Sequence, residues 1–335
     1  MDVRRPNGFP EAAFPATSHA ADEAKEEGIL LESRNPAMLA LLETIERAAA
    51  GDSTILLTGE SGTGKDVLAR QIHRWSPRRH GPFVVINCGT LSEPLMENEL
   101  FGHVRGSFTG AADDKPGRLE AGGGGTMLFD EIADLPTSLQ TKFLRFVQDR
   151  SLERIGSNRT LTVDVRVVAA SNRNLEAEVA AGRFRQDLYY RLNVITFTLP
   201  PLRERTQDIL PFADWMLKGI SNTIGRRELS LAPHAAEALV NYRWPGNIRE
   251  LHNALLRAAA LARSETITFD DLPDSIRHPV SSMSVPGAHG IRLKDFEREH
   301  ILRVLADSPT LGQAAATLGI NVTTLWRKRR HYGIG

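Results

Sequence analysis

The sequence contains a single cysteine, Cys88, and no long apolar run. One cysteine excludes an intrachain disulfide bond and a cysteine-based zinc site, and it fits a reducing compartment. No apolar run approaches the roughly 20 residues that a membrane-spanning helix needs. No apolar stretch follows Arg4 and Arg5, so the N-terminus does not read as a signal peptide. We therefore expect a cytoplasmic protein with no membrane partner, in which Cys88 is a small buried residue.

The chain also lacks an overall charge, because its 41 basic and 41 acidic residues cancel. Any attraction to nucleic acid must therefore come from a local cluster. The 335 residues, of which 41% are hydrophobic, are enough for two or three domains with real cores.

Apolar runs and breaks divide the sequence into five parts. Residues 1–28 have no periodicity and read as a flexible tail. In residues 29–201, apolar runs at 54–58, 83–86, 126–129, 165–170 and 194–197 alternate with helical stretches. This pattern predicts an α/β fold with a parallel sheet covered on both faces. Residues 202–276 read as helices only, residues 277–291 as a linker, and residues 292–335 as a last helical unit.

A glycine-rich loop follows the first apolar run and opens a helix, which is the context that a phosphate-binding loop requires. Its glycines allow backbone N–H groups to surround phosphates, and the lysine at its end reaches the terminal ones. Asp66 stands where a metal-binding Ser or Thr is usual, so Mg²⁺ must be held differently. The predicted ATP-binding residues here are Gly59, Glu60, Ser61, Gly62, Thr63, Gly64, Lys65 and Asp66.

Two carboxylates, Asp130 and Glu131, follow the third apolar run, at the end of the sheet where ligands bind. Asp130 is positioned to bind Mg²⁺, and Glu131 to polarise an attacking water. A solvated acidic turn is the alternative for this pair alone, but the phosphate loop favours a hydrolytic site. Asn172 ends another strand and could sense the phosphates.

The last helical unit has the pattern of a helix-turn-helix. Ala315 is small where two helices would cross, Gly319 permits the turn, and Leu325 packs the second helix back. That helix is basic without any acidic residue, which favours DNA, although a basic tail on a helical hairpin remains the alternative. The expected DNA contacts are Thr323, Thr324, Arg327, Lys328, Arg329 and Arg330.

From about residue 30 to residue 335, the sequence resembles the sigma-54-dependent transcriptional activators, also called bacterial enhancer-binding proteins. The most specific motif is Gly106-Ser-Phe-Thr-Gly-Ala111, where the family has a loop of sequence GAFTGA that contacts sigma-54. Ser107 replaces the usual Ala. The resemblance implies a sigma-54 contact by Gly106, Ser107, Phe108, Thr109, Gly110 and Ala111. It also implies an AAA+ fold with a helical lid, and a Fis-type domain at the end.

The resemblance assigns further roles. Asn87 matches the asparagine that holds the catalytic glutamate, here Glu131. Arg185 and Arg191 match arginine fingers that act on the neighbouring subunit's nucleotide. Arg249, in Trp244-Pro-Gly-Asn-Ile-Arg249, matches a sensor that reaches the nucleotide from the lid. An acidic residue after the loop lysine is normal in this family.

We therefore expect a transcription activator that binds upstream DNA and hydrolyses ATP, with Mg²⁺, to open promoters bound by sigma-54 RNA polymerase. As in the family, it should form a homo-oligomer, a hexamer. A passive DNA-binding regulator and an AAA+ protein remodeller are the alternative classes. Too few residues precede the ATPase to fold as a receiver domain. Either the chain is naturally without one and is controlled by a separate regulatory protein or by its own abundance, or it is part of a longer chain.

Overall fold

A computed structural model describes residues 33–278, 298, 301–302, 304–305, 308 and 310–332. The predicted tail at 1–28 and most of the predicted linker at 277–291 lie outside these residues. The chain divides into two units, Met1–Pro279 and Val280–Gly335.

The first unit contains a five-stranded sheet in which every described pairing is parallel. Its strands coincide with the five apolar runs, so the predicted α/β fold is confirmed. The order in space is β2-β5-β8-β1-β9. The strands are β1 (Ile55–Thr58), β2 (Phe83–Asn87), β5 (Thr126–Asp130), β8 (Arg166–Ser171) and β9 (Ile195–Thr198).

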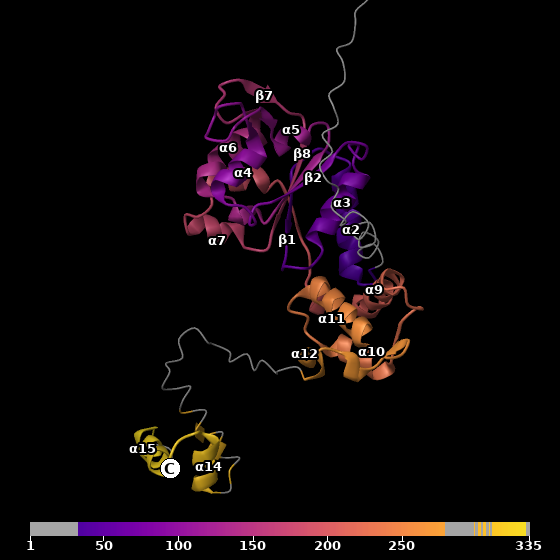
Figure 1. The fold of residues 1–335 in the computed structure, drawn as a ribbon, viewed down its shortest axis with the longest axis vertical. Helices are drawn as coiled ribbons and strands as arrows, with labels where there is room; N and C mark the ends of the chain where they lie inside the picture. Colours follow the sequence, from indigo (N-terminus) through magenta and orange to yellow (C-terminus); the bar gives the residue numbers. More distant parts are fainter. Residues whose placement is uncertain are drawn as a thin grey trace, which may run out of the picture. The chain divides into compact units, whose positions relative to one another are not determined.

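Helices cover both faces of this sheet (Figure 1). Alternate strand residues enter two different cores because successive side chains of a strand point to opposite faces. Leu57 and Val168 pack in the core that includes α2 and α3, whereas Leu56 and Val167 pack in the core that includes α4, α6 and α8. The helices are α2 (Pro36–Ala49), α3 (Lys65–Trp75), α4 (Glu93–Phe101), α5 (Arg118–Ala121), α6 (Thr137–Asp149), α7 (Leu175–Ala180) and α8 (Gln186–Leu192), with a 3-10 turn η2 (Ile132–Asp134).

Two small antiparallel pairs that the sequence pattern did not predict lie beside each other. β3 (Gly102–His103) pairs with β4 (Lys115–Pro116), and β6 (Ser151–Glu153) pairs with β7 (Thr160–Thr162). The Val104 N–H donates to the Ile155 carbonyl, and the Ile155 N–H donates to the Gly102 carbonyl. The loop between β3 and β4 is thereby joined at its base to the β6–β7 hairpin.

Residues after the sheet form a helical lid, as predicted, but not helices alone. A two-residue parallel pair, β10 (Ser230–Leu231) with β11 (Thr266–Ile267), corrects the prediction that strands stop after residue 201. Runs of two residues are too short to produce a strand pattern. The remaining elements are η3 (Leu202–Glu204), η4 (Thr206–Asp208), α9 (Ile209–Thr223), α10 (Pro233–Asn241), α11 (Asn247–Leu261), η5 (Phe269–Asp271) and α12 (Asp274–Arg277).

The second unit contains α14 (Leu311–Thr317) and α15 (Val322–Tyr332), joined by a tight turn. Gly319 has a φ of 67°, which favours glycine. Ala315 and Leu325 are buried in a small core with Ile301 and Val304. The predicted helix-turn-helix geometry is therefore present. Among the described residues of the chain, no helix is long and apolar enough to cross a membrane.

Candidate nucleotide site and contact surfaces

The glycine-rich loop leaves β1 and enters α3, and its glycines have conformations that other residues rarely adopt. Gly59, Gly62 and Gly64 have φ values of 145°, 77° and 94°. A β-carbon at Gly62 would lie only 2.4 Å from the Gly246 carbonyl oxygen. Glycine is therefore required both by the backbone turn and by the close approach of the lid.

Lys65 begins α3, and its side chain folds back over the loop. Its Nζ donates to the carbonyl oxygens of Gly59 and Glu60, both at 2.9 Å. Lys65 is buried, and burial lowers the pKa of its ammonium group. A cation in this position, next to the N-terminus of α3, suits a bound polyphosphate.

Asp130 and Glu131 lie at the carboxyl end of β5, and both line one cavity with the phosphate loop. Burial raises the pKa of Asp130, and the nearby carboxylates of Asp66 and Glu131 act in the same direction. Glu131 has a φ of 52°, a left-handed conformation unusual for glutamate. The cavity is lined by Ser61, Gly62, Gly64, Lys65, Asp66, Asp130, Glu131, Asn172 and Arg249. It thus joins the predicted phosphate ligands to the predicted metal and water ligands.

These residues fit Mg²⁺ bound with a nucleotide. The pKa of Asp130 is raised because its negative charge is poorly solvated and lies near two other carboxylates. A hard divalent cation relieves that excess of negative charge, and oxygen donors are the ligands that Mg²⁺ prefers. The described residues contain no cluster of three or more His, Cys, Asp or Glu that could hold a metal alone. Nucleotide phosphates would therefore supply the remaining ligands.

Asn87 lies opposite Asp130 in the register of the sheet. Its Oδ1 accepts a hydrogen bond from the Gly89 N–H at 2.9 Å. A β-carbon at Gly89 would lie 2.8 Å from Glu131 Oε2, so Glu131 reaches the same glycine. The described contacts include no direct hydrogen bond between Asn87 and Glu131, and the holding role of Asn87 stays a proposal.

The three arginines assigned by resemblance occupy two different places. Arg249, on α11, lines the cavity and donates from NH1 to Ser61 Oγ at 2.9 Å. Arg185 and Arg191 are exposed and are not among the residues that line this cavity. The Arg185 guanidinium forms two hydrogen bonds to the Asp187 carboxylate, at 2.7 and 3.1 Å.

One predicted nucleotide ligand points elsewhere. The Glu60 carboxylate accepts two hydrogen bonds from Arg203, at 2.6 and 2.8 Å, and one from Asn247 at 3.1 Å. The Arg203 guanidinium, followed by the Asn247 amide, holds the pKa of Glu60 below its usual value. The Glu60 side chain therefore binds the lid and does not line the cavity.

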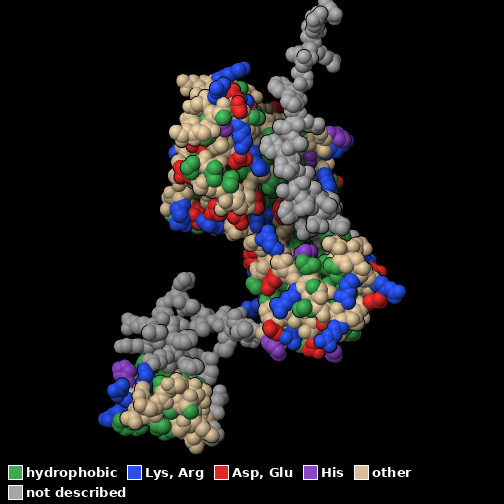
Figure 2. Space-filling view, viewed as in Figure 1, with side chains coloured by type: hydrophobic (Ala, Val, Ile, Leu, Met, Phe, Trp, Pro, Cys, Tyr) green, Lys and Arg blue, Asp and Glu red, His purple; other side chains and the backbone are tan. Residues whose placement is uncertain are grey.

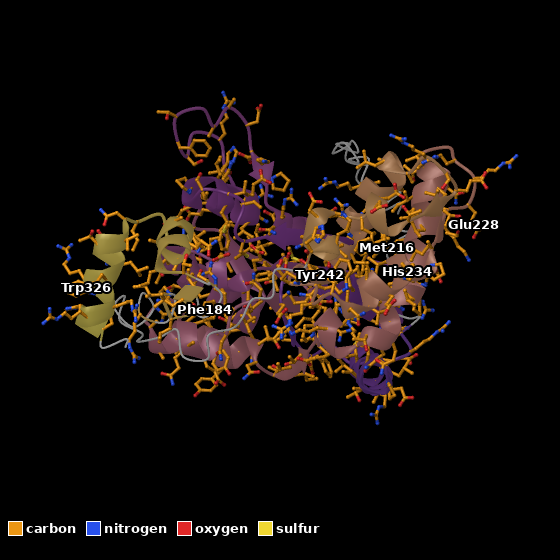
Figure 3. The ribbon with its side chains drawn as sticks, turned by 90° about the horizontal axis from the view of Figure 1, so that it is seen from below. Phe184, Met216, Glu228, His234, Tyr242 and Trp326 are labelled. Atoms are coloured by element: carbon orange, nitrogen blue, oxygen red, sulfur yellow. The ribbon has the colours of Figure 1, made fainter. Side chains whose placement is uncertain are left out.

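The loop between β3 and β4 presents an exposed aromatic residue. Gly106 and Gly110 have φ values of 80° and 106°, and the Gly106 N–H closes the loop on the Ala111 carbonyl. Phe108 is 45% exposed and meets the buried His103 ring edge-on, with 5.0 Å between ring centroids. The loop stands out from the α/β subdomain, in purple at the top of Figure 3. Thr109 is exposed beside Phe108.

Helix α15 contains the six predicted DNA contacts, and three of them, Thr323, Arg327 and Arg330, are exposed. Thr324, Lys328 and Arg329 are half-buried, and Leu325 is buried. Blue Lys and Arg side chains gather along one edge of this unit in Figure 2. Such a basic face suits the phosphates of DNA.

Matches to three protein families identify the family of this chain. Residues 31–198 match the sigma-54 interaction domain, residues 203–288 the AAA+ ATPase lid domain, and residues 292–332 the bacterial regulatory proteins of the Fis family. The chain belongs to the sigma-54-dependent transcriptional activators. This membership contradicts the alternative of an AAA+ protein remodeller.

Individual relatives agree with this membership. This activator is 50% identical over 313 residues to the alginate biosynthesis transcriptional regulatory protein AlgB of Pseudomonas aeruginosa, covering 93% of this chain and 70% of the relative. It is 45% identical over 296 residues to the transcriptional regulatory protein ZraR of Klebsiella oxytoca, covering 88% and 67%. A solved structure of NtrX from Brucella abortus in complex with ATP has a TM-score of 0.69 at 34% identity, covering 94% and 72%.

The activator also contains residues at its sites that the sequence did not single out. Arg203, Arg205 and Asn247 bond to the phosphate loop from the lid, although only the lid's Arg249 was expected to do so. Trp326, labelled on α15 in Figure 3, is 56% exposed, and Arg330 lies 5.7 Å from its ring centroid. A large exposed aromatic residue on a basic helix was a signal available from the sequence.

Proposed function

We propose that this activator hydrolyses ATP, with Mg²⁺, and couples hydrolysis to the opening of promoters bound by sigma-54 RNA polymerase. The single observation that carries this proposal is the exposed Phe108 on a glycine-hinged loop of the same unit that contains the phosphate-loop cavity. Glycines on both sides of an exposed aromatic side chain make a mobile loop whose tip suits a protein contact. The match of residues 31–198 to the sigma-54 interaction domain supports sigma-54 as that partner.

Each residue of the cavity has a chemical task in this proposal. The loop amides and Lys65 bind and orient the phosphates, and Asp130 holds the metal, which neutralises phosphate charge when bound. Glu131 accepts a proton from the attacking water, so its carboxylate must be ionised and face the terminal phosphate. Asn172 and Arg249, which line the same cavity, contact the phosphates as sensors. The solved complex of NtrX with ATP supports ATP as the nucleotide.

Arginine fingers act between subunits in this proposal. Arg185 and Arg191 are exposed and lie outside the cavity of their own subunit. Tyr190 and Val194, close to them in sequence, are 64% and 55% exposed, which suits a surface that another copy covers. We infer a homo-oligomer, as a hexameric ring, in which each guanidinium neutralises charge on the neighbour's nucleotide.

The C-terminal unit binds upstream DNA through α15, with Thr323, Thr324, Arg327, Lys328, Arg329 and Arg330 as the contacts. The match of residues 292–332 to the Fis family supports this role. Because DNA and RNA polymerase are its partners, the cytoplasm is its proposed location.

Replacement of Phe108 by Ala tests the coupling. The variant should hydrolyse ATP at the wild-type rate, because Phe108 does not line the cavity, yet it should fail to open promoters. Leu261→Ala is the control, because Leu261 is 60% exposed on α11 of the lid and lies outside the loop. The measurements are the ATPase rate and open-complex formation with purified sigma-54 polymerase. Normal opening by Phe108→Ala would refute the coupling role of the loop.

A further inference from the structure

The backbone carbonyl groups of residues 59–63 in the phosphate loop all accept hydrogen bonds, some from side chains of the loop and of Lys65 and some from residues after the sheet. Lys65 Nζ serves the first two carbonyls, those of Gly59 and Glu60. The next three carbonyls accept hydrogen bonds from the hinge, which is the segment 202–208 at the start of the lid, and from the rest of the lid. These bonds are Asn247 Nδ2 to Ser61 O at 3.0 Å, Ile248 N to Gly62 O at 2.9 Å and Arg205 NH2 to Thr63 O at 2.9 Å.

This arrangement orients the N–H groups of the loop. In a trans peptide, the carbonyl of one residue and the N–H of the next point in opposite directions. Carbonyls of Ser61, Gly62 and Thr63 that point to the hinge and lid therefore turn the following three N–H groups, at residues 62–64, away from them. Gly62 and Gly64 line the cavity on that opposite side. Successive inward N–H groups of this kind form an anion-binding nest.

Asn247 connects the phosphate loop to the lid through its side-chain amide. Its side chain is fully buried, and its backbone has a φ of 52°, which asparagine tolerates better than most residues. Its Nδ2 bonds to Ser61 O and Glu60 Oε2, while its Oδ1 accepts the Leu202 N–H at 2.8 Å. One amide thus ties the phosphate loop to the lid and to the first residue of the hinge turn.

Arg205 adds a buried positive charge beneath the loop. It is fully buried, and the described part of the chain offers no hydrogen-bond partner to its Nε and NH1 atoms. Burial lowers the pKa of its guanidinium to about 10, and Asp208 acts against that shift. An incompletely satisfied buried guanidinium is costly to the fold. Its one described hydrogen bond is to the phosphate loop, and its charge favours an anion on the other side of that loop.

We propose that Asn247 and Arg205 are positioning residues for the nucleotide, which set phosphate affinity by holding the loop amides in the nest geometry. The Glu60–Arg203 ion pair also joins the phosphate loop to the segment 202–208. It lies at the surface, where both side chains are about two-fifths exposed. Movement of the lid away from the loop releases three carbonyls at once and weakens the nest. This inference rests on the proposed function, in which the cavity binds a nucleotide. It explains why the affinity for nucleotide depends on the position of the lid.

Binding of ADP by purified variants tests the proposal without hydrolysis. Asn247→Gly keeps the left-handed backbone and removes the side chain with its hydrogen bonds to Ser61, Glu60 and Leu202. Arg205→Met removes the charge at similar volume. Each variant should bind ADP about tenfold more weakly, because each loses a hydrogen bond to a phosphate-loop carbonyl that helps to orient an amide toward a charged ligand. Asn247→Asp should be weaker still, because a carboxylate cannot donate to Ser61 O and repels Glu60.

A conservative surface variant tests the same contact without removing a buried side chain. Glu60→Gln lies at the surface and should raise the Kd for ADP about threefold, as an exposed ion pair contributes little. The matched control is Glu120→Gln, because the Glu120–Arg154 pair has the same bond lengths, 2.6 and 2.8 Å, but lies outside the cavity lining. Its Kd should equal that of the wild type. In all variants the KM for ATP should rise with the Kd.

Two outcomes separate this inference from the function on which it rests. If the wild type binds neither ADP nor ATP, the proposed function fails. If the wild type binds ADP and the Asn247 and Glu60 variants bind it equally well, the positioning role is wrong, even if their thermal midpoints without nucleotide are lower. A rise in Kd together with an unchanged midpoint in Glu60→Gln supports the proposal.

Discussion

Ser107 contains a hydroxyl oxygen that is buried at the base of the projecting loop, and the described residues offer it no hydrogen-bond partner. Its β-carbon faces Gly156 in the β6–β7 hairpin, where a β-carbon would lie 2.6 Å away. Replacement of Ser107 by Ala, the usual residue of the family, removes the unpaired hydroxyl and keeps the packed β-carbon. The variant should therefore be more stable than the wild type.

The size of the gain follows from the burial. An unpaired buried hydroxyl costs about 1–3 kcal/mol in proteins. Ser107 as a whole is half-buried, so the lower end of that range applies and the free energy of unfolding should rise by about 1 kcal/mol. In a unit of this size, that corresponds to a rise in thermal midpoint of roughly 2–4 °C.

Thermal and urea unfolding of the purified protein measure this change. The control is Gly156→Ala, which should change the stability in the opposite direction. Gly156 has a φ of 80°, so its Ala variant should lose about 1–2 kcal/mol from backbone strain, with the clash against Ser107 adding to the loss. Promoter opening by Ser107→Ala should match the wild type, because Phe108 and Thr109 are unchanged. A lower thermal midpoint for Ser107→Ala would show that its hydroxyl has a partner, and the reasoning would be wrong.

Three further predictions concern the two sites. Glu131→Ala should bind ATP but not hydrolyse it, whereas Lys65→Ala should not bind it; wild-type turnover by the first variant, measured as phosphate release, would remove Glu131 as the base. Arg185→Ala and Lys65→Ala subunits, each inactive alone, should regain some ATPase activity when mixed, because one supplies the finger and the other the nucleotide site. No recovery in stable mixed oligomers would count against action in trans. Arg330→Ala should reduce the slope of log affinity for DNA against log salt by about 0.9, as one phosphate contact is lost; an unchanged slope would indicate that Arg330 does not touch DNA.

Local patterns in the sequence were enough to predict the main elements. Buried parallel strands are apolar throughout, so the five runs were visible, and a phosphate loop needs glycines at fixed spacing whatever the rest of the fold does. The turn at Gly319 and the buried Leu325 followed from the same kind of local reasoning. Burial of Cys88, which raises the pKa of its thiol to about 12, was also predicted. The short pairs β3–β4, β6–β7 and β10–β11 were missed because two or three residues contain no period.

Asp130, Glu131, Asn172 and Arg249 were expected at the phosphate loop and line its cavity. Only the tertiary structure decided the order of the strands and which other residues hold the loop. Strand β1 lies between β8 and β9, which follow it by more than a hundred residues, and no local pattern determines that order. Asn247 is 186 residues from Ser61, yet its amide helps to orient the phosphate loop. Glu60 has the sequence position of a nucleotide ligand, but the fold places Arg203 beside its carboxylate and the two side chains form hydrogen bonds. The composition and spacing of a motif describe residues that are close together in the sequence. These contacts join residues that are far apart in the sequence, and they form only when the chain has packed.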